Sequence, residues 1–193
     1  MKEFFAVASL VASLAANIPY VYETIKGKVK PERVSWLLWT LLGGTYYVSA
    51  VFEDGATWFT FGELIGPGII LLLAIKFGVG GKSKLDMYSL VVALIAFSLL
   101  FVVEGVIVSL LLALLVDGIG AALTIRKLLL DPASESRNFW LLGAIASALA
   151  LLSLQTYSLE TVLFPLYVLL LSAYITLKAN PAKVKNLDQL EKL

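Results

Sequence analysis

Seven apolar segments, each long enough to cross a lipid bilayer as a helix, occupy almost the whole of this 193-residue chain. They cover residues 4–23, 34–52, 57–77, 86–103, 106–126, 138–154 and 159–177. An α-helix rises about 1.5 Å per residue, so about 20 apolar residues span a hydrocarbon layer about 30 Å thick. Hydrophobic residues make up 60% of the chain and charged residues 15%, against roughly 45–50% and 25% in an average soluble domain. The sequence therefore predicts an all-α integral membrane protein with seven transmembrane helices.

Two stretches of the sequence allow a second interpretation. Residues 86–126 are almost continuously apolar and break only at Glu104-Gly105, but a single helix of that length would span far more than one bilayer. Two helices are therefore the better interpretation. Residues 4–16 also resemble the apolar part of a signal peptide. Because the apolar stretch continues to Val21, and Glu3 offsets Lys2 before it, we expect this segment to be retained as the first helix.

Basic residues fall almost entirely on one side of the predicted membrane. Fourteen of the fifteen Lys and Arg residues lie on that side: Lys26, Lys28, Lys30, Arg33, Lys76, Lys82, Lys84, Arg126, Lys127, Arg137, Lys178, Lys183, Lys185 and Lys192. Only Lys2 lies on the other side. The positive-inside rule then places the C-terminus in the cytoplasm and the N-terminus outside. Merging or removing one helix would destroy this asymmetry, so the charges support seven helices independently of hydropathy.

The chain contains neither cysteine nor histidine. Disulfides, thiol catalysis, Cys/His metal sites and imidazole acid–base chemistry are therefore excluded. We expect no enzymatic activity, no cofactor and no metal. The net charge of +1 gives no reason to expect a nucleic-acid partner.

An internal repeat divides the seven helices. Residues 24–26 (Thr-Ile-Lys) close the first predicted helix, and a proline-containing loop leads to Trp36; residues 124–126 (Thr-Ile-Arg) close the fifth, and a similar loop leads to Trp140. We predict two three-helix units, residues 1–80 and 105–179, joined by a linker helix within residues 81–104 and followed by a polar cytoplasmic tail, residues 180–193. Since each unit has an odd number of helices, the linker helix makes the two units parallel.

This plan, with residues 16–20 (Ala-Asn-Ile-Pro-Tyr), 30–39 (Lys-Pro-Glu-Arg-Val-Ser-Trp-Leu-Leu-Trp) and 164–167 (Phe-Pro-Leu-Tyr), resembles the PQ-loop/SWEET superfamily. Within it, the chain is most similar to uncharacterised prokaryotic membrane proteins of this size. The resemblance covers residues 4–178 and implies two parallel three-helix bundles in the plasma membrane of a prokaryote. Pro19-Tyr20 stands where the family has its Pro-Gln pair, and the third and seventh helices lack the asparagines of sugar pockets. The resemblance therefore implies the fold but not a sugar substrate.

A pair of polar residues at matching places in the repeat is the leading site candidate. Asp117 lies near the middle of the fifth helix, where a carboxylate costs much free energy and is usually functional. Asn17 is its counterpart in the first helix. We predict that both belong to a substrate-binding or proton site. The alternative for Asp117 is a structural hydrogen bond to a neighbouring helix, through Asn17 or Ser147.

Prolines inside the predicted helices mark candidate hinges. Pro67, flanked by glycines, frees a backbone carbonyl near Glu63 in the third helix, so Glu63 is a candidate binding or gating residue. The alternative is that the kink only fits helix packing and Glu63 reaches the outer interface. Pro165 repeats the feature in the seventh helix, where Tyr167 is a candidate cavity residue. We predict Pro19, Pro67 and Pro165 as hinges.

Aromatic residues supply the remaining candidates. Trp39 is a candidate for stacking on a substrate. The alternative is an interfacial belt or packing, because Trp36, Trp39 and Trp140 all lie near cytoplasmic helix ends, where a belt is the usual role. Tyr47 and Tyr46 lie deeper in the second helix and either line a cavity or pack against neighbours.

The predicted function is transport of a small polar solute by alternating access. The substrate class is open between a sugar, an amino acid and a vitamin-like metabolite, and proton coupling through a buried carboxylate is an option. The alternative is a non-transporting receptor or scaffold on the same heptahelical fold. The expected partners are membrane lipid and the solute, and a homo-oligomer is compatible with the sequence.

Overall fold

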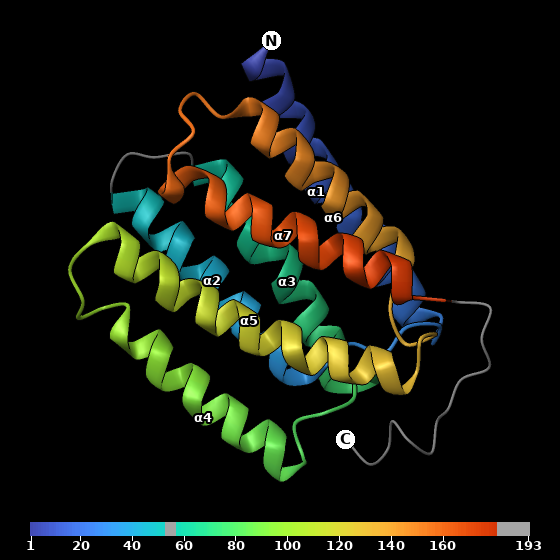
Figure 1. Cartoon of the computed structure of the whole chain (residues 1–193). Coiled ribbons are helices and arrows are strands. Elements are labelled where there is room, and N and C mark those ends of the chain that lie inside the picture. Colours follow the sequence, from blue (N-terminus) through green and yellow to red (C-terminus); the bar gives the residue numbers. More distant parts are fainter. Residues whose placement is uncertain (53–56, 181–193) are drawn as a thin grey trace.

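The computed structural model describes the backbone of residues 1–52 and 57–180 and the side chains of residues 1–48 and 64–180. The described chain is all-helical (Figure 1), with the helices α1 (Lys2–Ile25), α2 (Arg33–Phe52), α3 (Thr57–Phe77), α4 (Lys84–Leu99), α5 (Val106–Leu130), α6 (Arg137–Ser153) and α7 (Leu159–Lys178). Each apolar segment of the sequence corresponds to one of these seven helices. The prediction of seven helices is therefore confirmed for the part of the chain that the structure describes.

Two predicted helix ends differ from the structure. The Thr-Ile-Arg triplet at residues 124–126 does not close the fifth helix, because α5 continues to Leu130. Arg126 pairs with Asp86 of α4, so the helix continues without leaving this charge unpaired. The fourth helix ends at Leu99 rather than near residue 103. Gly105, the N-cap residue before α5, has a φ of +107°, a conformation that a residue with a Cβ rarely adopts.

The helices pack in a reciprocal pattern. α3 lies against both α1 and α2, and α7 lies against both α5 and α6. Across the molecule, α1 packs on α6 while α2 packs on α5. α4 lies at the edge of the bundle alongside α5 (Figure 1). The first helix of each group of three thus contacts the second helix of the other group.

Three of the described helices, α1, α5 and α7, are long and apolar enough to cross a membrane. Large apolar side chains are also exposed at helical spacing around the bundle. On α1 they are Phe4, Val7, Val11, Leu14, Ile18, Tyr22 and Ile25, and on α7 Leu159, Leu166, Leu170, Tyr174 and Leu177. A folded protein in water rarely exposes so much contiguous apolar surface, so the structure supports membrane association.

Four segments that carry most of the basic residues meet at one end of the bundle. The amide of Lys30 donates to the carbonyl of Ser134 at 3.1 Å, and the amide of Val79 donates to the carbonyl of Pro31 at 2.9 Å. The chain after α7 joins them through a further backbone hydrogen bond to the loop after α5. We call this the basic end: residues 26–33, 78–84, 126–137 and 178–180.

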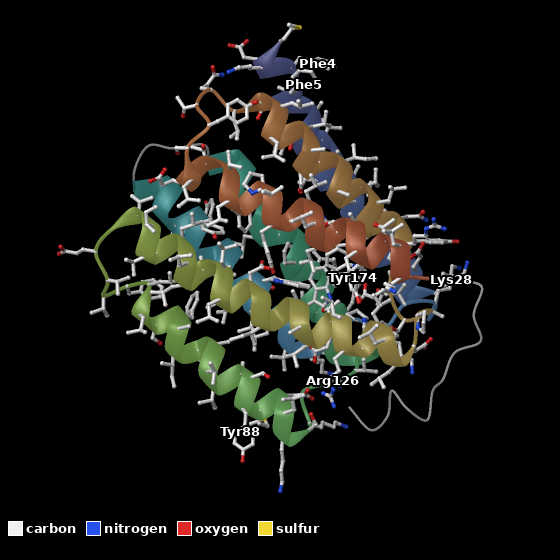
Figure 2. The ribbon with its side chains drawn as sticks, viewed as in Figure 1. Phe4, Phe5, Lys28, Tyr88, Arg126 and Tyr174 are labelled. Carbon is white, nitrogen blue, oxygen red and sulfur yellow. The ribbon has the colours of Figure 1, made fainter. Side chains whose placement is uncertain are left out.

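The N-terminus lies at the opposite end. The Lys2 ammonium donates to the carbonyl of Gln155, in the connection between α6 and α7, at 3.2 Å. Figure 2 shows Phe4 near this end of α1 and Lys28 beyond its other end. The one-sided distribution of charge is therefore present in the described fold; residues 183, 185 and 192 of the predicted set lie outside the described residues.

Candidate functional site

A cavity of about 210 Å³ lies between the two groups of three helices. Every described helix except α4 contributes to its lining. Asp117 and Asn17, the pair expected from the repeat, both line it, and so do Trp39 and Pro67. Four of the predicted site and hinge residues are thus brought together at one place.

Asp117 connects three helices at this cavity. The Tyr167 hydroxyl of α7 donates to its Oδ2 at 2.6 Å, and Trp39 of α2 is a second hydrogen-bonding neighbour of the same carboxyl. The expected alternative partners, Asn17 and Ser147, are not the ones found: Ser147 donates instead to the carbonyl of Gly143 in its own helix. Tyr167 was predicted as a site residue, but its pairing with Asp117 was not.

Asn17 lies where α1 and α3 approach closely. Its Nδ2 donates to the carbonyl of Ser13, one turn earlier, at 3.2 Å. A Cβ added to Gly66 of α3 would lie 2.7 Å from Asn17 Oδ1, so only a glycine leaves room for the amide there. The donor capacity of Asn17 is therefore partly used within its own helix.

Aromatic rings form the wall of the cavity nearest the basic end. Trp36 and Trp39 meet edge to face at 5.0 Å between centroids, and Trp39 meets Trp140 at 6.1 Å. Trp36 is only 2% exposed and Trp140 only 5%. Of the two roles expected as an alternative to substrate stacking, an interfacial belt or packing, these two rings show packing, because both turn into the bundle and not toward its outside.

A buried ion pair lies beneath the aromatic wall. Lys127 of α5 pairs with Glu135, and the two side chains are 0% and 1% exposed. Glu135 also accepts from Trp140 Nε1 at 2.8 Å and from the Tyr20 hydroxyl at 3.3 Å. Trp36 Nε1 donates to that same hydroxyl at 3.2 Å. A continuous hydrogen-bonded layer thus closes the cavity toward the basic end.

A second buried carboxyl secures the start of α2. Glu32 Oε2 accepts from the amide of Ser35 at 2.5 Å. The Ser35 hydroxyl lies 2.7 Å from the same Oε2 and 2.6 Å from the carbonyl oxygen of Gly120 in α5, and its one proton is shared between these two acceptors. Burial raises the pKa of Glu32 above its ordinary value, and the Ser35 donors oppose that shift. Glu32 therefore links α2 to α5.

The sequence interpretation missed both of these buried carboxyls. It counted Lys127 only as one of the basic residues of that face, but its ammonium is fully buried. The available signal was that Glu32 and Glu135 stand in short loops beside the positions where helices begin and where capping acceptors are favoured. Nothing in the sequence indicates that both loops fold into the bundle.

Four further predicted residues, Tyr47, Tyr167, Pro19 and Pro165, are not among the described residues that line the cavity. Tyr47 is half-buried but its neighbour Tyr46 lines the cavity. Pro19 and Pro165 lie inside α1 and α7 without lining it. The side chain of Glu63 lies outside the described residues.

No group of three or more acidic residues is placed to hold a metal ion in the described part of the chain. No protein-family model, curated protein or solved structure matches the sequence. The resemblance to the PQ-loop/SWEET superfamily thus stays a prediction that rests on the sequence motifs and the three-one-three plan.

Proposed function

We propose that the chain is a seven-span membrane transporter that moves a small polar solute by alternating access. The observation that carries this proposal is the cavity between the two helix groups, with the Asp117 carboxyl in its lining and a closed layer beneath it. A central site between two similar units is what a rocking mechanism requires.

The reciprocal helix packing supports two parallel units, residues 1–80 and 105–179. Because α1 contacts α6 and α2 contacts α5, a two-fold axis along the membrane normal would exchange the two groups. Rocking of one group against the other would then open the cavity at one end and close it at the other.

The described conformation corresponds to closure at the basic end. There, Tyr20 and Trp36 are 0% and 2% exposed. Tyr46 lies about three turns further along α2 and is 38% exposed. We propose that the basic end faces the cytoplasm of a prokaryote by the positive-inside rule, so this state is closed toward the cytoplasm.

Flux measurements in proteoliposomes test the proposal. A panel of sugars, amino acids and vitamin-like metabolites is assayed with and without a pH gradient, comparing the wild type with Asp117→Asn. Glu104→Gln, an exposed charge-neutralising change outside the cavity, is the matched control. We expect Asp117→Asn to lose most flux and Glu104→Gln to keep it.

The other outcomes of this assay are equally specific. A wild type that is folded but moves no solute contradicts transport. A stoichiometric protein partner captured from native membranes would then favour the receptor or scaffold alternative. Flux that ignores both the pH gradient and Asp117→Asn would exclude proton coupling through this carboxyl.

A further inference from the structure

The cavity lining has an unusual balance of chemical groups. Its described side chains include one carboxyl, Asp117, and neither a lysine nor an arginine. Six aromatic residues accompany the carboxyl: Trp36, Trp39, Tyr46, Phe139, Trp140 and Phe164. They come from α2, α6 and α7, so rings surround the space from more than one side.

From this balance we infer that the ligand of the cavity is a small organic cation, such as an alkylated ammonium. The inference rests on the proposed function and specifies its substrate class. An ionised carboxylate in an apolar surrounding needs a counter-charge. Since the described lining supplies none, the ligand itself brings the positive charge to Asp117.

The aromatic rings favour the same class of ligand. The face of a tryptophan or tyrosine ring attracts a cation, and ammonium ions are commonly bound inside aromatic cages. Trp39 is both a ring of this wall and a hydrogen-bonding neighbour of Asp117. The carboxyl and one ring of the aromatic wall therefore lie next to each other in the cavity.

The other solute classes fit this lining less well. An anion would meet Asp117 without a compensating basic residue. A sugar needs several paired hydrogen-bonding groups, but the polar side chains here are few and partly engaged. Ser147 donates to the carbonyl of Gly143, and Asn17 donates to the carbonyl of Ser13.

The test compares two probes of nearly equal shape that differ in charge. Choline carries a trimethylammonium group, and 3,3-dimethylbutan-1-ol carries a neutral tert-butyl group in its place. Purified protein in detergent is titrated with each, and tryptophan fluorescence is recorded, because Trp36, Trp39 and Trp140 line the cavity. We expect saturable binding of choline that is at least about tenfold tighter than that of the alcohol.

Asp117→Asn provides the second comparison. It keeps an acceptor for the Tyr167 hydroxyl but removes the charge, so choline binding should fall to the level of the alcohol. Equal binding of the two probes by the wild type overturns the inference, and so does the absence of choline binding. The comparison of the two probes on the wild type does not depend on the variant, so it tests the inference even where Asp117→Asn fails to fold.

Flux is measured separately, so the two proposals fail separately. Choline binding without flux of any cation would keep the cation site and contradict transport. Flux of a neutral solute without choline binding would keep transport and contradict the cation site.

Discussion

The buried ion pair between Lys127 and Glu135 gives the sharpest quantitative prediction. Lys127→Met keeps most of the side-chain volume but removes the ammonium, leaving Glu135 inside the bundle with only the neutral donors of Trp140 and Tyr20. The ammonium also donates to the carbonyls of Lys30 and Ser134, which lose this donor.

The magnitude follows from the burial of both partners. The side chains are 0% and 1% exposed, and removal of one partner of such a pair costs about 3–5 kcal/mol. The ratio of folded to unfolded protein should therefore fall roughly 10²–10⁴-fold. The double variant Lys127→Met/Glu135→Gln leaves no buried charge at this site and should recover at least half of the loss.

The assay is reversible unfolding in detergent micelles, followed by circular dichroism and tryptophan fluorescence. Lys28→Met is the matched control, because Lys28 is exposed beyond the end of α1 (Figure 2) and surface changes usually stay within about 0.5 kcal/mol. A Lys127→Met protein as stable as this control, or a double variant no better than Lys127→Met, would refute the reasoning.

Three further changes have defined outcomes. Gly80→Ala should destabilise the protein clearly more than Gly27→Ala in the same unfolding assay. Both glycines have positive φ, but a Cβ at residue 80 would lie 1.9 Å from Glu32 Oε1, whereas a Cβ at residue 27 would have no atom within 4 Å. Equal losses of stability in the two variants would contradict this contact. Because the pKa of Glu32 is raised on folding from its ordinary value of 4.5, its carboxyl favours the folded state fully only at pH values below that value, and this contribution is lost as pH rises through the raised pKa. The stability of Glu32→Gln relative to wild type, measured between pH 4 and 8, should therefore increase with pH, and a flat or falling difference would speak against the shift. Tyr167→Phe removes the donor to Asp117 and should weaken choline binding or flux about tenfold. The control Tyr88→Phe, at an exposed position of α4 (Figure 2), should change neither. Equal effects of the two variants would contradict a role for the Tyr167 hydroxyl.

Helix positions were largely predictable from the sequence, because the apolar segments are long and interrupted by charged or glycine-containing turns. Even the weak break at Glu104-Gly105 separates α4 from α5 in the structure. The ends of α4 and α5 differ from the prediction, and at the end of α5 the charges of Arg126 and Lys127 had indicated a loop. Hydropathy shows that these two residues are charged but not which residues pair with them. In the structure Arg126 pairs with Asp86 and Lys127 with Glu135, so the helix can continue past both.

The cavity was predictable only in part. A carboxyl in the middle of an apolar helix pointed to Asp117, and the repeat pointed to Asn17. The rotation of each helix about its axis was not available from hydropathy, since every helix is apolar around most of its circumference. The inward orientation of Trp36 and the choice of Tyr46 over Tyr47 therefore had to come from the structure.

Access to the cavity from the two sides of the membrane tests the central claim most directly. The chain has no cysteine, so a single Ser147→Cys in the cavity lining can be labelled with a membrane-impermeant maleimide from either side of oriented vesicles. Leu115→Cys, at an exposed position of α5, is the control for lipid exposure. Alternating access predicts that residue 147 reacts from each side in turn while residue 115 reacts from neither. Reaction from only one side under all ligand conditions, or from neither, would contradict transport through this cavity.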